Sequence, residues 1–237
     1  MELTGSTALV TGANRGLGAA FARGLLAAGA RTVYAGARNP VESDVPGLVP
    51  VRLDITDPGQ VAEAARRLCD VTLVINNAGV FHGAHALDDG VEEALRADLE
   101  TNVFGTLAVS RAFAPVLAAN GGGALVNVLS VASWRSAPQF AAYGASKAAA
   151  WSVTNSLRLE LRPLGTQVVA VHAGFLDTDM AASVNAPKTS PDEVVAKVLD
   201  ALRYGREEVL VDEVTHRVKA GLAADVAVQY PLVAATS

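Results

Sequence analysis

The stretch Thr7-Ala8-Leu9-Val10-Thr11-Gly12-Ala13-Asn14-Arg15-Gly16-Leu17-Gly18 decides the fold of this chain. It begins with a short apolar run, residues 7–10, which has the length and composition of a buried β-strand. Three glycines follow within the next eight residues. Residues 17–28 are rich in alanine and leucine and predict a helix that ends at Gly29. A strand, a glycine-rich turn and a helix in direct succession indicate an α/β fold.

The alternation of strand and helix continues along the chain. The strand candidates are apolar throughout, which is typical of a parallel sheet covered on both faces. Residues 38–48 hold two prolines and one glycine, so the second crossover is predicted to be a loop. We therefore expect residues 1–237 to form a single-domain doubly wound parallel sheet of the Rossmann type, with about seven strands and helices on both faces. The predicted strands are residues 7–10, 31–36, 48–53, 71–75, 124–128, 167–171 and 208–211, and the predicted helices are residues 17–28, 60–68, 91–119, 143–161 and 191–204.

Composition excludes several classes of protein. The chain has 237 residues, a formal charge of −5 and one cysteine, Cys69, which rules out an internal disulfide. A mildly acidic balance argues against binding nucleic acid as a polymer, although residues 1–41 hold four arginines against one acid. No run of 18 apolar residues occurs, so we expect no membrane span. The opening residues 1–5 lack the features of a signal peptide, so we expect a cytoplasmic protein.

The glycine-rich turn predicts a phosphate site. Glycines let the backbone approach a pyrophosphate closely, and the N-terminus of the following helix supplies free N–H groups and a positive dipole. The spacing here is Gly-x-x-x-Gly-x-Gly, in place of the commoner Gly-x-Gly-x-x-Gly. Because the turn follows a strand and opens a helix, the context is that of a dinucleotide-binding fold.

Five sequence elements in this order resemble the short-chain dehydrogenase/reductase family, over residues 5–211. The resemblance implies hydride transfer between a nicotinamide cofactor and a carbonyl/alcohol pair, as in an NADP(H)-dependent carbonyl reductase. The elements are Thr11-Gly12-Ala13-Asn14-Arg15-Gly16-Leu17-Gly18, Asn76-Asn77-Ala78-Gly79, Asn102, Ser130 and Tyr143-Gly144-Ala145-Ser146-Lys147.

Four residues are the predicted catalytic group. Tyr143 and Lys147 lie at i and i+4 and therefore face one side of a helix. An ammonium about 4 Å from a phenolate, at an effective dielectric of ~20, stabilises it by roughly 4 kcal/mol. We therefore expect a lowered pKa for Tyr143, which would be general acid in reduction and general base in oxidation. Ser130 would hold the substrate carbonyl oxygen. The resemblance implies that Asn102 anchors a relay water and that Lys147 holds the nicotinamide ribose.

The residues after the second strand favour NADP(H), with NAD(H) also possible. Residues 34–38 contain no acid that would bind a ribose 2′-hydroxyl, and Arg38 and Arg15 are placed to bind a 2′-phosphate. The resemblance also implies adenine contacts at Asp54 and nicotinamide contacts after the sixth strand. The predicted cofactor residues are Gly12, Asn14, Arg15, Gly16, Leu17, Gly18, Arg38, Asp54, Ile55, Asn77, Ala78, Gly79, Tyr143, Lys147, Gly174, Leu176 and Thr178.

Apolar and aromatic residues near these motifs are candidates for the substrate pocket. If several of them line it, the substrate is an apolar or aromatic ketone, aldehyde or secondary alcohol. Residues 175–190 would form a modest lid. Most relatives have Pro-Gly where this chain has Ala173-Gly174, which puts the rigidity of that loop in doubt. His82 and His85 are too few ligands for a metal site, so none is expected. The pocket candidates are Phe81, Val131, Trp134, Phe140, Phe175 and Met180.

Other functions stay open from the sequence alone. One is NAD-dependent alcohol oxidation, another is reduction of 3-oxoacyl groups on a carrier, and a third is a non-catalytic NADP(H)-binding regulator. Reduction is the expected direction. The expected partner is a small carbonyl or alcohol substrate, without nucleic acid or membrane. The resemblance further implies a homo-oligomer, a dimer or tetramer, formed through the helices that carry Asn102 and Tyr143.

Overall fold

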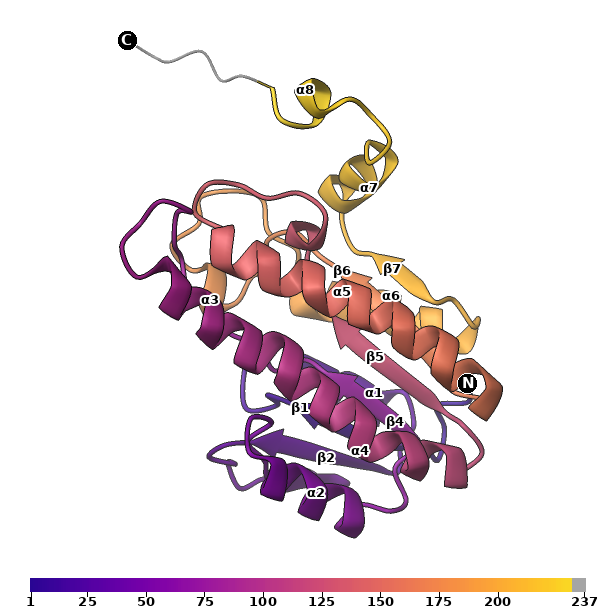
Figure 1. The fold of residues 1–237 in the computed structure, drawn as a ribbon. Coiled ribbons are helices and arrows are strands. Elements are labelled where there is room, and N and C mark those ends of the chain that lie inside the picture. Colours follow the sequence, from indigo (N-terminus) through magenta and orange to yellow (C-terminus); the bar gives the residue numbers. More distant parts are fainter. Residues whose placement is uncertain (232–237) are drawn as a thin grey trace.

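The computed structural model describes residues 1–231, which contain a sheet of seven parallel strands. The order of the strands is β3-β2-β1-β4-β5-β6-β7 (Figure 1). Because β1 pairs with both β2 and β4, the chain order reverses between β1 and β4. The predicted doubly wound fold is confirmed. The strands are β1 (Thr7–Thr11), β2 (Thr32–Ala37), β3 (Leu48–Arg52), β4 (Leu73–Asn76), β5 (Ala124–Val128), β6 (Gln167–His172) and β7 (Glu208–Leu210).

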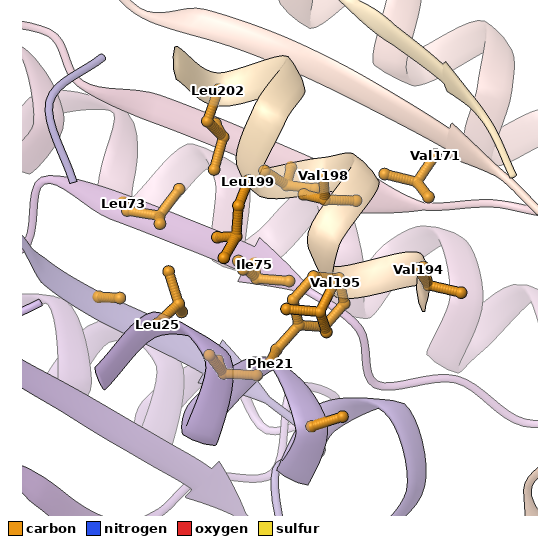
Figure 2. Packing of buried hydrophobic residues seen from close by; sticks show 14 of the residues in the cluster. Phe21, Leu25, Leu73, Ile75, Val171, Val194, Val195, Val198, Leu199 and Leu202 are labelled. Carbon is orange, nitrogen blue, oxygen red and sulfur yellow. The ribbon is translucent and has the colours of Figure 1, made fainter. Parts of the chain in front are cut away.

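Helices cover both faces of the sheet. Val10 belongs to the apolar cluster beneath α1 and α6, whereas its neighbour Leu9 belongs to the cluster beneath α2, α4 and α5. Figure 2 shows Phe21 and Leu25 of α1 packed near Val195 of α6. Burial on both faces explains why the central strands are mostly apolar on both sides. The helices are α1 (Gly16–Ala27), α2 (Pro58–Arg67), α3 (Val91–Leu99), α4 (Thr106–Ala119), α5 (Ala141–Leu161), α6 (Pro191–Arg203), α7 (Glu213–Ala220) and α8 (Val226–Gln229).

The connections between elements follow local chemistry. Residues 38–47, between β2 and β3, contain no helix, as their prolines and glycine predict. Helix α2 starts two residues before the predicted helix because Asp57 caps it, accepting from the N–H groups of Gly59 at 2.9 Å and Gln60 at 3.0 Å.

The predicted helix over residues 91–119 is continuous but not uniform. Between α3 and α4 the chain forms a π-helical turn, η1 (Glu100–Gly105), which contains Asn102. The stretch Val91–Ala119 is long and apolar enough to cross a membrane, and 44% of its most apolar window is buried. Val109 and Phe113 lie in the core beneath this helix layer, so packing on the sheet accounts for the apolar composition.

The last described elements, α7 and α8, lie beyond the sheet (Figure 1). After β7 the helices α7 and α8 extend away from the sheet (Figure 1). Tyr230 nevertheless contacts the loop before α5, since its hydroxyl accepts a hydrogen bond from the N–H of Ser136 at 3.3 Å. The Arg135 guanidinium lies 5.8 Å from the centre of the Tyr230 ring. Residues 232–237, which the predicted domain includes, lie outside the described residues.

Candidate active site

The site lies at the carboxyl ends of the central strands, where the strand order reverses. In doubly wound sheets the loops leaving these strand ends enclose the ligand site. Residues 12–15 follow β1, residues 77–90 follow β4, residues 129–140 follow β5 and residues 173–190 follow β6. All these loops contain residues that the sequence predicts for the site.

The glycine-rich loop after β1 is shaped to hold an anion. Gly12 and Gly16 have φ angles of 67° and 53°, in the left-handed region that favours glycine. A side chain on Gly18 would overlap the Gly12 carbonyl oxygen. Arg15, the N-cap residue of α1, makes no side-chain cap, and the first turn of the helix holds no acid. The first N–H groups of α1 are therefore suited to the phosphates of a dinucleotide.

Asn77 ties the loop after β4 to the loop after β1. Its Nδ2 donates to the carbonyl oxygen of Thr11 at 2.9 Å and to that of Gly12 at 3.3 Å. In return the hydroxyl of Thr11 accepts from the N–H groups of Asn77 and Ala78, both at 3.0 Å. The side chain of Asn77 thus fixes the shape of the glycine-rich loop.

The region beyond β2 lies beside the glycine-rich loop, and the two segments hold the residues predicted for a 2′-phosphate. Arg38 follows β2 and is exposed. Asn14 donates to the Asn39 carbonyl oxygen at 2.7 Å, which holds the glycine-rich loop beside that segment. Arg15 lies 3.0 Å from the carboxylate of Asp179 in an exposed ion pair. One of the two predicted arginines therefore has an acidic partner on the loop after β6.

Asp54 and Ile55, predicted for the adenine, have structural contacts. The carboxylate of Asp54 accepts from the N–H of Thr56 at 3.0 Å and from its hydroxyl at 2.8 Å, which closes a turn. Ile55 is buried and lies against Gly105, where any added side chain would collide with it.

Ser130, Tyr143 and Lys147 meet at the end of β5. Ser130 is buried, and its Oγ accepts from the N–H of Ala132 at 3.1 Å. The Ser130 hydroxyl lies close enough to Tyr143 to lower the pKa of that residue. Lys147, one helical turn further along α5, donates to the Val128 carbonyl oxygen at 3.0 Å. Its Nζ lies 5.7 Å from the centre of the Tyr143 ring.

Asn102 reaches this group from the π-helical turn. Its Oδ1 accepts from the N–H of Val80 at 2.9 Å, and its Nδ2 donates to the Val80 carbonyl oxygen and to the Ser146 hydroxyl, both at 3.0 Å. Gly79 lies between Asn102 and Lys147, because a side chain there would come within 3.1 Å of Asn102 Oδ1 and 3.6 Å of Lys147 Nζ. The four predicted catalytic residues therefore surround the loop after β4.

Burial dominates the proton affinities of this group. It raises the pKa of Tyr143 to about 12; the negative charge of Asp98 adds to the rise, and the hydrogen bond from Ser130 opposes it. Burial also lowers the pKa of Lys147 to about 8, opposed by Asp98. The expected lowering of the Tyr143 pKa by Lys147 is wrong for the chain alone, because burial raises this pKa and the group that lowers it is Ser130, not Lys147.

Three of the pocket candidates form an aromatic cluster with Tyr143. The Phe81 ring lies edge-on to Tyr143, with centres 5.3 Å apart, and 5.4 Å from the ring of Phe140. Phe140 lies 6.3 Å from both Tyr143 and Phe175. The loop after β4 and the start of α5 thus place aromatic side chains against the Tyr143 ring, and the loop after β6 extends the cluster through Phe140.

The other pocket candidates are not part of this cluster. Trp134 stacks on His172 with ring centres 3.7 Å apart, and its edge meets Trp151 at 6.1 Å. Met180 is exposed, and Val131 is half-buried at the start of the short helix η2 (Val131–Ser133). Trp134 is predicted for the pocket because it is close to Ser130 in sequence. In the structure the turn of η2 directs its side chain toward His172 of β6.

The loop after β6 closes against the glycine-rich loop. A side chain on Gly16 would lie 3.3 Å from the methyl group of Thr178. The N–H of Gly174 donates to the Asp212 carboxylate at 2.6 Å, which anchors the loop where most relatives have a proline. Leu176 forms a β-bridge with Thr189, so that the proposed lid begins and ends side by side.

One buried acid beside the catalytic group was not predicted from the sequence. Asp98, on α3, is 0% exposed, and its carboxylate accepts from Nδ1 of His82 at 2.7 Å. An acid four residues before Asn102 in an otherwise amphipathic helix is the signal that could have drawn attention to it. The backbone N–H of His85 donates to the carboxylate of Asp88 at 2.8 Å. Within residues 1–231 no group of three metal-binding side chains occurs.

Comparison with known proteins identifies the family. The sequence pattern of the short chain dehydrogenases matches residues 6–189. An uncharacterized oxidoreductase of Staphylococcus aureus (strain USA300) is 31% identical over 230 residues, covering 91% of this chain and 98% of the relative. An uncharacterized oxidoreductase of Myxococcus xanthus (strain DK1622) is 36% identical over 198 residues, or 78% of each chain.

A solved structure gives the same result. The crystal structure of a short chain dehydrogenase from Burkholderia cenocepacia J2315, in complex with NADP, is 45% identical. It superposes with a TM-score of 0.91 and 95% of either chain covered. This chain belongs to the short-chain dehydrogenase family of oxidoreductases.

Proposed function

We propose that the protein transfers hydride between NADP(H) and a ketone, aldehyde or secondary alcohol, with Tyr143 as the general acid and base. The observation that carries this proposal is the meeting of Ser130, Tyr143 and Lys147 at the sheet edge that also holds the glycine-rich loop. The 45% identical Burkholderia protein binds NADP.

The residues around the glycine-rich loop fit that cofactor. The N–H groups at the start of α1 would bind the pyrophosphate, and Arg38 and Arg15 would bind the 2′-phosphate. For Arg15 this means exchanging the carboxylate of Asp179 for the phosphate. Lys147 would hold the nicotinamide ribose, and Gly174, Leu176 and Thr178 would contact the nicotinamide end. When bound, the cofactor supplies or accepts the hydride.

The protein's own groups would handle the proton. In reduction, the hydroxyl of Ser130 donates to the substrate carbonyl oxygen and fixes its position, and the Tyr143 hydroxyl gives that oxygen its proton. A pKa of about 12 keeps Tyr143 protonated and able to donate in the closed site. Lys147 stabilises the phenolate that results, and Asn102 anchors the water through which Tyr143 is protonated again.

The aromatic cluster supports an apolar or aromatic substrate. Phe81 and Phe140 lie against Tyr143, Phe175 packs behind Phe140, and these rings offer no charged group to a substrate. An aromatic ring on the substrate would pack among them at the usual centre separations of about 4.5–7 Å.

Turnover with a panel of carbonyl compounds tests the reaction. We expect NADPH to be consumed with aryl ketones or aldehydes, and Tyr143→Phe to lower kcat at least about 10³-fold with the Kd for NADPH unchanged. A wild-type protein that binds NADPH tightly without turnover would instead be a regulator. Faster turnover of carrier-bound 3-oxoacyl groups than of free ketones would replace the substrate proposed here.

Cofactor choice is tested by comparing NADPH with NADH at equal concentration. We expect NADPH to be preferred and Arg38→Ala to lose at least about tenfold in kcat/KM with NADPH, since a charge-assisted bond to phosphate is lost. Its kcat/KM with NADH should change little. An Arg38→Ala variant that loses both cofactors equally contradicts the phosphate assignment.

The proposal extends to the organisation of the chain. Residues 1–237 would act as one domain, with residues 175–190 as the lid, which already reaches the glycine-rich loop where Asp179 pairs with Arg15. The protein would work in the cytoplasm, where a lone exposed cysteine such as Cys69 stays reduced. It would form a homo-oligomer through α4 and α5.

A further inference from the structure

Asp98 is a buried carboxylate that the proposed reaction does not use. Its side chain is 0% exposed and accepts from the Nδ1 of His82 at 2.7 Å, with the N–H of His82 a further 3.5 Å contact. Taking a carboxylate out of water is costly unless charges or donors compensate it. The imidazole of His82 is half-exposed, so Asp98 faces the protein interior while His82 faces outward.

The position of Asp98 places it beside the catalytic group. Helix α3 packs against α5, which carries Tyr143 and Lys147. Asn102, four residues after Asp98, donates to Ser146, the neighbour of Lys147, at 3.0 Å. His82 lies three residues after Gly79, which separates Asn102 from Lys147. Asp98 thus lies on α3, which packs on the helix of Lys147, and His82 lies in the loop after β4, which passes beside Lys147.

Lys147 needs a negative counterpart. Its ammonium is buried, and its hydrogen bond goes to a neutral carbonyl oxygen, that of Val128. The charge that favours its protonated form is that of Asp98, which opposes the effect of burial and acts on Tyr143 as well.

Other charged groups near these helices are poorly placed for this role. On α3, Glu92, Glu93 and Arg96 are exposed to solvent, where water screens them. On β6, burial lowers the pKa of His172 to about 4, so that residue is neutral at working pH. On α5, the next charged residue after Lys147 is Arg158, about three helical turns away.

We propose that Asp98 is the buried counter-charge that keeps Lys147 protonated, and through it a positioning residue for proton transfer at Tyr143, with His82 fixing the carboxylate. This rests on the proposed function for the role of Lys147 in catalysis. The charge relation between Asp98 and Lys147 itself can be measured without any substrate.

The direct test is the titration of Lys147 by NMR of protein labelled with ¹³C at the lysine ε-carbon. The sequence holds four lysines, and Lys147→Arg identifies the resonance. The wild-type resonance should titrate near pH 8. In Asp98→Asn it should titrate at least about one pH unit lower, the usual effect of removing a unit charge within about 10 Å at an effective dielectric of ~20.

A matched control separates this charge from charge in general. Glu92→Gln removes an equal charge from the exposed first turn of the same helix and should leave the titration unchanged. Equal shifts in Glu92→Gln and Asp98→Asn, or no shift in Asp98→Asn, overturn the proposal. If Asp98→Asn does not fold, the double variant Asp98→Leu/His82→Leu replaces the pair by apolar residues, as folded proteins often tolerate. It should show the same downward shift.

Catalysis provides a second readout. In Asp98→Asn the alkaline limb of the pH profile for carbonyl reduction should move to lower pH by the shift measured for Lys147. A rate lowered equally at every pH, with no movement of the limb, means a merely structural role and overturns the proposal. A Lys147 shift in an enzyme with no carbonyl turnover supports the charge relation and instead contradicts the proposed function.

Discussion

At the scale of single residues, Thr11 shows how one hydroxyl holds two loops together. It ends β1, is almost fully buried, and accepts from the N–H groups of Asn77 and Ala78, both at 3.0 Å. A valine has nearly the same shape but no oxygen, so both N–H groups would lose their partner.

We expect Thr11→Val to lower the free energy of unfolding by about 1–3 kcal/mol and to weaken cofactor binding, because the glycine-rich loop loses its anchor. Urea unfolding and NADPH titration measure the two effects. Thr11→Ser keeps the hydroxyl and should cost about 1 kcal/mol, the price of one methyl group. Equal losses of stability and of NADPH affinity in the two variants would mean that the hydroxyl of Thr11 does not anchor the loop.

His172 should make the stability depend on pH. Its Nδ1 donates to the Ser130 carbonyl oxygen at 3.2 Å, and burial lowers its pKa to about 4 from the ordinary value of 6.5. Between these values the unfolded chain binds a proton that the folded protein does not. The contribution of His172 to the free energy of unfolding is therefore fully present above pH 6.5. It falls by about 3 kcal/mol as the pH decreases toward 4.

His172→Asn checks this residue's share, because the amide can still donate to Ser130 but does not titrate. Urea unfolding of both proteins at pH 7, 6, 5 and 4 should show the wild type losing more stability than the variant over this range. Curves that run parallel from pH 7 to 4 would show that His172 is not the group responsible.

At the scale of elements, Asp212 joins a helix to a loop of the site. One carboxylate oxygen caps α7 by accepting from the N–H of Thr215 at 2.8 Å, and the other holds the N–H of Gly174 at 2.6 Å. The sequence raised doubt about this loop because it lacks a proline. The compensating acid could not be predicted, since it lies 38 residues further along the chain.

Two variants of Asp212 should separate its two roles. Asp212→Asn keeps an oxygen for the helix cap but presents an amide to Gly174, so the KM for NADPH should rise several-fold with stability nearly unchanged. Asp212→Ala should raise KM similarly and also cost about 1 kcal/mol of stability through the lost cap. Initial rates and urea unfolding measure both. An unchanged KM in Asp212→Asn would contradict the anchoring role.

The helical layer shows where sequence patterns stop being informative. Periodicity predicted one helix over residues 91–119, and the structure has it, but with a π-helical turn at Glu100–Gly105. An extra residue in one turn leaves hydrophobic periodicity on either side nearly intact. Only contacts across the fold reveal it, such as Gly105 against Ile55 and Asn102 against Val80. Similarly, spacing found Tyr143 and Lys147, but Asp98 required knowledge of what α3 packs against.

At the scale of the whole molecule, the fold was predictable because each local signal agreed with the same topology. Val10 and Leu9 are both apolar since opposite faces of the sheet are covered, and a chain of such strands joined by helices has few other solutions. The side chains that fill the site were less predictable. Phe81, Phe140 and Phe175 converge from three separate segments, whereas Trp134, which is nearer to Ser130 in sequence than any of them, packs against His172.

Assembly is the remaining property at this scale, and the outer surface of the helices offers a test of it. Phe104 in η1 and Leu159 on α5 are large apolar side chains exposed on the helices through which an oligomer is proposed. A stable dimer usually buries about 800 Å² on each partner, with apolar residues at the centre of the interface. Covering these two side chains would remove apolar surface from water in each copy.

We expect light scattering with size-exclusion chromatography to give the mass of a dimer or tetramer for the wild type. Phe104→Glu/Leu159→Glu should shift the mass toward the monomer, because charges would be buried without partners. Leu87→Glu is the matched control, since Leu87 is equally apolar and is 98% exposed on the loop before α3. A monomeric wild type refutes the assembly, and a mass that only Leu87→Glu changes would place the interface on that loop.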